Sequence, residues 1–117
     1  MQTILVAEDE SGIRKMVADV LRKAGYRVLA AASGQDAIAA AARHGAGIDL
    51  LLTDIVMAGM GGADLYAWMK SERPYIKVLF ISGVMSREPL EGAFLKKPFT
   101  PAELLAKVEE VLSARAA

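Results

Sequence analysis

Short apolar runs rich in β-branched residues recur along this chain, and they constrain its fold more than any other feature. The first, third and fourth runs are apolar at nearly every position, with little alternation of polar residues. Strands of this kind are covered on both faces, as in a parallel sheet between two layers of helices. The five runs are residues 3–7, 26–30, 48–52, 76–81 and 93–95.

Apolar residues at helical spacing fill most of the sequence between these runs. The clearest helix is the last, with Thr100 as the expected N-cap, Pro101 at the first helical position and Glu103 at the third. The alternation of strands and helices predicts a doubly wound α/β fold with three layers. The other three helices are expected from Ile13 to Gly25, from Ser33 to about Arg43, and between Gly62 and Pro74.

The connection between the fourth and fifth strands is unusually short. Only 11 residues separate Ser82 from Phe94, and they include Pro89 and Gly92. A crossover between parallel strands normally takes about a dozen residues or more. We therefore expect a shortened fourth crossover, a loop or at most one or two helical turns.

Charge and composition exclude several classes of protein. The 14 basic and 14 acidic residues give zero net charge, so there is no electrostatic reason to expect a nucleic acid or an anionic membrane as partner. The absence of cysteine excludes disulfide scaffolds, thiolate zinc sites and cysteine nucleophiles. No uncharged apolar run approaches the ~20 residues needed to cross a bilayer. These features indicate one cytoplasmic globular domain over residues 1–117, without membrane insertion.

Charged and hydroxyl side chains follow four of the five predicted strands. The carboxyl ends of parallel strands meet at one edge of the sheet, where such folds bind their ligands. Carboxylates without histidine or cysteine favour a hard cation such as Mg²⁺ over zinc. The side chains expected at this edge are Glu8, Asp9, Glu10, Asp54, Ser82 and Lys97.

This set of side chains suits phosphoryl transfer. Close carboxylates repel and raise one another's pKa unless a cation holds them together, and the same cation would neutralise an arriving phosphoryl group. Lys97 could pair with a second phosphate oxygen, and Ser82 could donate to a third. A carboxylate can itself be the nucleophile and form an aspartyl-phosphate. Asp54, alone at the end of the central strand, is the natural candidate.

Four segments together resemble the receiver domain of two-component response regulators. They are residues 6–10 (Val-Ala-Glu-Asp-Glu), 51–57, 80–83 and 94–99, and the resemblance runs in order through essentially the whole chain. It implies a five-stranded parallel sheet of order 2-1-3-4-5 with helices on both faces, as in flavodoxin-like folds. It also implies a signalling domain, not an enzyme, that accepts a phosphoryl group from a sensor histidine kinase or a histidine phosphotransfer protein and signals to a downstream protein.

The resemblance assigns a role to each residue of the site. Asp54 would be the phosphoacceptor and Lys97 the cation that pairs with the phosphoryl group, before a Lys97–Pro98 bond that is usually cis in this family. Ser82 and Phe94 would be the switch residues. Mg²⁺ would be bound by Asp9, by Glu8 through water, by Asp54, and by the backbone carbonyl of Val56.

The chain departs from the family pattern in the loop after the acceptor. Residues 57–62 read Met-Ala-Gly-Met-Gly-Gly, without the usual proline and aspartate. The loop therefore lacks a rigid turn and a side-chain N-cap for the third helix. Since the chain ends at its last helix, we expect a stand-alone regulator or the receiver of a hybrid sensor kinase.

The sequence disfavours three other functions. A docking module that is never phosphorylated would be expected to lack the acceptor, the acid pair or the lysine, and this sequence keeps all of them. A flavin-binding module needs a neutral phosphate loop after the first strand, where Glu8, Asp9 and Glu10 would repel phosphate. A hydrolase with an aspartyl nucleophile usually has a second acid two residues on, at the position of Val56.

Overall fold

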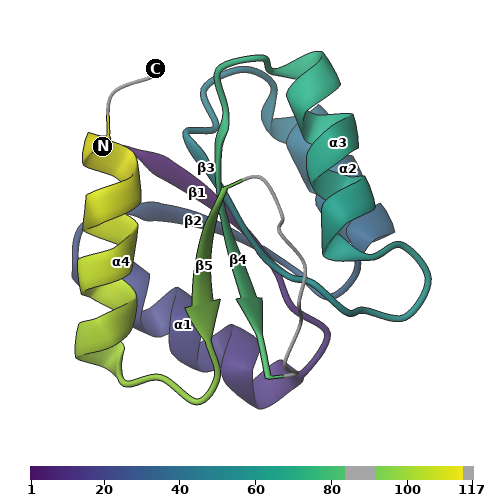
Figure 1. The fold of residues 1–117 in the computed structure, drawn as a ribbon. Helices are drawn as coiled ribbons and strands as arrows, with labels where there is room; N and C mark the ends of the chain where they lie inside the picture. The colour runs from purple at the N-terminus through teal and green to yellow at the C-terminus, as the bar shows by residue number, and fades with distance from the viewer. Residues whose placement is uncertain (84–91, 115–117) are drawn as a thin grey trace.

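Five parallel strands and four helices make up the part of the chain that the computed structural model describes, residues 1–83 and 92–114 (Figure 1). The strands are β1 (Thr3–Ala7), β2 (Arg27–Ala31), β3 (Leu50–Asp54), β4 (Lys77–Ser82) and β5 (Ala93–Lys96). The helices are α1 (Ser11–Lys23), α2 (Gly34–His44), α3 (Gly62–Glu72) and α4 (Pro101–Ser113).

The sheet has the order β2-β1-β3-β4-β5, and every neighbouring pair is parallel. This confirms the predicted order. The register sets which residues share an edge: Asp54 lies opposite Ile81, and Ser82 lies opposite Lys96. The carboxyl ends of β3, β4 and β5 therefore come together at one edge of the sheet.

Helices cover both faces of the sheet. Helices α1 and α4 lie on one face, and α2 and α3 lie on the other (Figure 1). Successive residues of β3 pack into different cores: Leu50 and Leu52 face α1 and α4, while Leu51 faces α2 and α3. Burial on both faces is the reason why this strand is apolar along most of its length.

Most of the predicted boundaries lie within two residues of the observed ones. Strand β1 has the predicted bounds, whereas β3 begins at Leu50 instead of Ile48 and extends to Asp54, because pairing with β4 continues that far. The shortened crossover cannot be compared in the same way, because residues 84–91 lie outside the described part of the chain. Among the described residues, no helix is long and apolar enough to cross a bilayer.

The helix termini follow their local sequence signals. Gly25, with a φ of 101°, ends α1 as expected, because a left-handed residue at this point stops a helix. The N-cap of helix α3 is Gly61, so the helix has no side-chain cap, as the departure from the family pattern predicts. Helix α4 has a full capping box, in which Thr100 Oγ1 accepts from Glu103 N at 3.1 Å and Glu103 Oε1 accepts from Thr100 N at 2.8 Å.

Loss of this capping box tests how much the last helix contributes to stability. We expect Thr100→Ala to lower the free energy of unfolding by about 1 kcal/mol, because one amide of the first turn loses its acceptor. Urea denaturation measures the change. Thr100→Ser keeps the hydroxyl and should stay within about 0.5 kcal/mol of the wild type. Equal losses in the two variants would contradict a role for the hydroxyl.

Candidate functional site

One ammonium group joins the ends of three strands. Lys97, just after β5, places its Nζ 3.0 Å from Glu8 Oε1 and 3.0 Å from Asp54 Oδ2. Glu8 directly follows β1, and Asp54 is the last residue of β3. The Lys97 side chain is only 18% exposed, so the two ion pairs are partly shielded from water. The structure thus brings the predicted lysine to two of the predicted acids.

Three carboxylates gather beside this ammonium. Oxygen atoms of Glu8, Asp9 and Asp54 lie within 4.8 Å of one another. Glu8 is fully buried, Asp54 is 7% exposed, and Asp9 faces solvent. Glu10 serves a different purpose: its Oε1 accepts a 2.8 Å hydrogen bond from Ile13 N and caps α1. Of three consecutive acids, two therefore belong to the cluster and the third starts a helix.

Glu8 is held through its backbone as well as its side chain. Its amide donates to Ala31 O at 3.0 Å, and its carbonyl accepts from Arg14 Nη1 at 2.9 Å. Its Oε2 accepts from Glu10 N at 3.0 Å. Its Oε1 is buried against the Lys97 ammonium, with which it forms an ion pair at 3.0 Å. A carboxylate oxygen can accept more than one partner, so Oε1 could also bind a cation beside Lys97.

Burial and charge shift the pKa values of the central pair. Burial raises the pKa of Glu8, and the charge of Asp54 adds to this, while the Glu10 amide and Lys97 oppose it. Burial alone would lower the pKa of Lys97, but its contacts with Glu8 and Asp54 outweigh that effect and raise it. Lys97 thus stays protonated, and the ionised form of Glu8 is costly without more positive charge nearby.

The donor set fits a hard divalent cation. All the candidate ligands are carboxylate oxygens, which suit Mg²⁺. The single charge of Lys97 does not balance the three carboxylates, and one of them, that of Glu8, is fully buried. Both observations favour a cation at this position. Glu8, Asp9 and Asp54 are the residues that would hold it.

The backbone around Asp54 is packed tightly against the start of α3. A Cβ atom on Gly62 would lie 2.2 Å from the Asp54 carbonyl oxygen, so this position requires glycine. Thr53, which is fully buried, donates its hydroxyl to the same carbonyl at 3.0 Å. Neither residue is predicted to have this role from the sequence. A glycine pair before a helix is the only sequence signal for the close approach.

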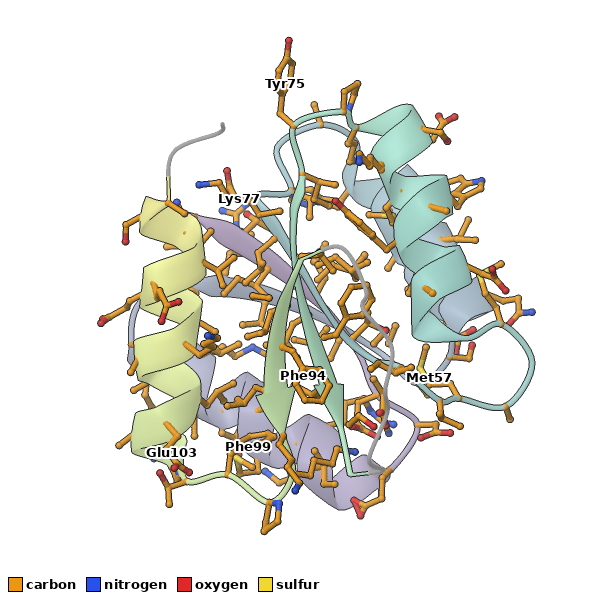
Figure 2. The ribbon with its side chains drawn as sticks, in the orientation of Figure 1. Met57, Tyr75, Lys77, Phe94, Phe99 and Glu103 are labelled. Carbon is orange, nitrogen blue, oxygen red and sulfur yellow. The ribbon has the colours of Figure 1, made fainter. Side chains whose placement is uncertain are left out.

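The predicted switch residues lie next to this cluster. Ser82 is buried at the end of β4, and its carbonyl accepts from Lys97 N at 2.8 Å. Phe94 is on β5 (Figure 2). It lies opposite Phe80 of β4 and is 40% exposed. Val56, two residues after Asp54, is 64% exposed. The Lys97–Pro98 bond is cis, as the resemblance implies.

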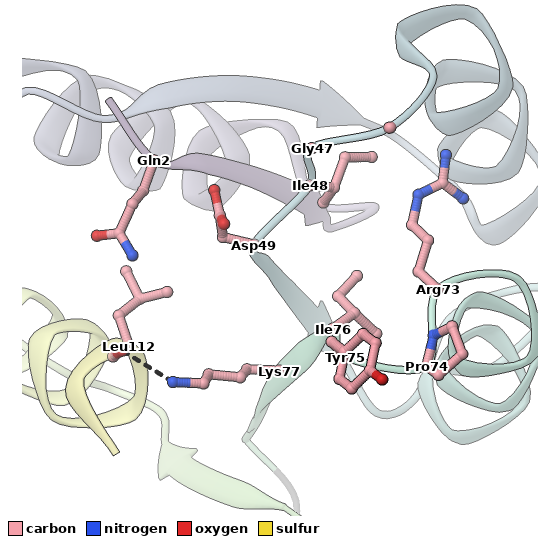
Figure 3. Close-up of a pocket in the computed structure, with 11 residues that line it drawn as sticks. Gln2, Gly47, Ile48, Asp49, Arg73, Pro74, Tyr75, Ile76, Lys77 and Leu112 are labelled. Carbon is pink, nitrogen blue, oxygen red and sulfur yellow. Dashed lines mark hydrogen bonds between the residues drawn. The ribbon is translucent and has the colours of Figure 1, made fainter. Parts of the chain in front are cut away.

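The opposite edge of the sheet has a hollow of a different kind. It has a volume of about 300 Å³ and lies near the amino ends of β3 and β4, beside Tyr75 (Figure 3). Its two cations bind helix ends: Lys77 donates to Leu112 O, and Arg73 donates to Ala41 O. These two bonds connect β4 to the end of α4, and the end of α3 to the end of α2. In Figure 2, Tyr75 and Phe99 lie at opposite ends of the molecule. Phe99 is two residues after Lys97, so this hollow is remote from the acidic cluster.

A sheet of this order, with an acidic cluster and a lysine at its carboxyl edge, defines an α/β signalling domain of the receiver class. The sequence model described as "Response regulator receiver domain" matches residues 4–109. The chain therefore belongs to the response regulator receiver family of two-component systems and is a phosphorelay signalling domain.

Two curated relatives illustrate the contexts of such domains. The response regulator receiver protein CpdR of Brucella abortus is 34% identical over 121 residues, which cover 97% of this chain and 99% of CpdR. The sensor kinase CckA of the same bacterium is 34% identical over 117 residues, which cover 94% of this chain but only 12% of CckA.

Solved structures agree with the fold. The crystal structure of the receiver domain from hybrid histidine kinase CckA has a TM-score of 0.85 at 35% identity and covers 95% of this chain and 99% of that one. The response regulator TrrA of Thermotoga maritima, crystallised in complex with Mg²⁺–BeF, has a TM-score of 0.82 at 27% identity, over 95% of this chain and 99% of that chain.

Because burial disfavours the ionised form of Glu8, a substitution that removes its charge is predicted to stabilise the fold. In EDTA, we expect Glu8→Gln to raise the free energy of unfolding by about 1 kcal/mol, because burial and the charge of Asp54 disfavour the ionised form of Glu8. The glutamine oxygen can still accept from Glu10 N. Chemical denaturation measures the change.

Asp9→Asn is the matched control. Asp9 is exposed and makes no hydrogen bond or ion pair with the described residues, so its substitution should change stability by no more than about 0.5 kcal/mol. A destabilised Glu8→Gln protein would show that the ion pair with Lys97 outweighs the cost of burial.

Proposed function

We propose that Asp54 accepts a phosphoryl group from the phosphohistidine of a sensor kinase or a histidine phosphotransfer protein. The observation that carries this proposal is the Lys97 ammonium, 3.0 Å from Asp54 Oδ2 and 3.0 Å from Glu8 Oε1, beside a cluster of three acids. A nucleophilic carboxylate and a fixed cation are the groups that transfer to an acceptor aspartate requires.

In this transfer the Asp54 carboxylate attacks phosphorus. A new P–O bond forms on Asp54, the P–N bond to the donor histidine breaks, and the histidine nitrogen leaves with the electron pair. Lys97 already touches one Asp54 oxygen, so it is in position to pair with a phosphoryl oxygen as the negative charge moves onto the acceptor. Ser82, buried at the end of β4, supplies a hydroxyl for the product.

Glu8, Asp9, Asp54 and the Val56 carbonyl would bind Mg²⁺. When bound, this ion would neutralise the carboxylates and the charge of the transferring group. The three carboxylates gathered around a single ammonium support such a site. The Mg²⁺–BeF complex of TrrA, a relative with the same fold, supports it independently.

Phosphorylation would act by shifting a conformational equilibrium. Ser82 would move toward the phosphoryl group, and Phe94, now 40% exposed, would turn toward the space that is vacated. A downstream protein would read this change. Residues 1–117 would act as one receiver domain in the cytoplasm, and the only reactions they catalyse would be their own phosphorylation and dephosphorylation.

The proposal predicts a simple labelling result. Incubation with acetyl phosphate and Mg²⁺ should add one phosphoryl group to the wild-type protein, detected by intact mass spectrometry. EDTA should prevent the gain, because uncompensated carboxylates repel the donor.

Asp54→Asn should show no gain of mass, while Asp49→Asn should be labelled normally. Asp49 lies at the opposite edge of the sheet, where its Oδ2 accepts from Thr3 N at 2.8 Å. Labelling of the Asp54→Asn protein, or no labelling of the wild type at saturating donor, would refute Asp54 as the acceptor.

A further inference from the structure

We propose that Arg14 is a positioning residue for the metal site, because it fixes the peptide that carries Asp9. This inference rests on the proposed function, since it concerns Mg²⁺ binding by Glu8, Asp9 and Asp54. Arg14 lies in the second turn of α1, and its Nη1 donates to the Glu8 carbonyl at 2.9 Å.

Asp9 depends on its backbone for its place in the cluster. Its exposed carboxylate makes no hydrogen bond or ion pair with the described residues. Glu8 differs, because its carboxylate is held by the Glu10 amide and by Lys97. The direction in which the Asp9 side chain leaves the chain is therefore set by the Glu8–Asp9 peptide.

The carbonyl of that peptide is the group that Arg14 holds. The amide of Glu8 is fixed by Ala31 O at 3.0 Å, but this bond belongs to the preceding peptide. Among the described residues, Arg14 is the side chain that binds the Glu8 carbonyl. Without it, the peptide is free to rotate, and Asp9 loses its alignment with Asp54.

Charge and positioning make opposite predictions for this residue. Arg14 is a cation near an acidic cluster, so removing its charge should by itself favour a divalent cation. Removing the hydrogen bond should weaken binding, because groups that orient metal ligands typically contribute tenfold or more to affinity. The sign of the change therefore identifies which effect dominates.

The test compares Arg14→Met with Arg14→Lys and with Arg22→Met. Arg22 is a matched control: it lies on the same helix, and its Nη2 donates to a backbone carbonyl, that of Val28, at 3.2 Å. Mg²⁺ titrations followed by ¹H–¹⁵N NMR give the dissociation constants, and urea denaturation without metal gives the stabilities.

We expect Arg14→Met to bind Mg²⁺ about tenfold more weakly. Arg14→Lys, which keeps a donor and the charge, should recover most of the affinity, and Arg22→Met should bind as the wild type does. The two methionine variants should lose similar stability, since each loses one bond of the same kind.

Unchanged or tighter Mg²⁺ binding by Arg14→Met would overturn the assignment while leaving the proposed function intact. A loss of affinity in Arg22→Met as large as that in Arg14→Met would also overturn it, because the effect would then belong to α1 in general. If the wild-type protein bound no Mg²⁺, the proposed metal site itself would fail, and the role of Arg14 with it.

Discussion

The contact of Lys97 with Glu8 and Asp54 is the interaction on which the site depends. It gathers side chains from three strands, and it works only if β1, β3 and β5 end at the same edge of the sheet. Parallel pairing in the order β2-β1-β3-β4-β5 supplies this alignment. One cation nevertheless leaves three carboxylates close together, so the site keeps an excess of negative charge that a divalent ion would relieve.

The stability of the domain comes from elsewhere. Two apolar cores, one on each face of the sheet, bury the central strands, while the acidic edge holds a carboxylate whose ionised form is disfavoured by burial. Because the two cores supply the stability, the edge can hold closely spaced charges at some cost to it. At this edge, the Thr53 hydroxyl and the close approach of Gly62 constrain the Asp54 backbone without adding charge.

Features with a local cause were predictable from the sequence, and those that depend on approach in space were not. The strand order came from resemblance, while the cap at Thr100 follows from a short-range signal that the structure confirms. Nothing in the run Glu8-Asp9-Glu10 tells which acid caps α1, because that depends on how the chain turns between β1 and α1. In the sequence, Arg14 is an ordinary charged residue of an amphipathic helix. Its hydrogen bond to the Glu8 carbonyl is visible only in the structure.

The register of β4 and β5 explains how a change at the acidic edge would reach the surface. Residues two apart on a strand point to the same face, so Ser82 and Phe80 share a face, and Phe94 lies opposite Phe80 on that face. Phe80 also meets Tyr66 of α3 edge-to-face, with ring centroids 5.8 Å apart. A shift of Ser82 toward a phosphorylated Asp54 would therefore alter the packing around Phe80, and Phe94 is the neighbour with room to respond because it is not fully buried. On this geometry the sheet itself need not deform: rotation of one exposed ring is enough to change the surface that a partner meets.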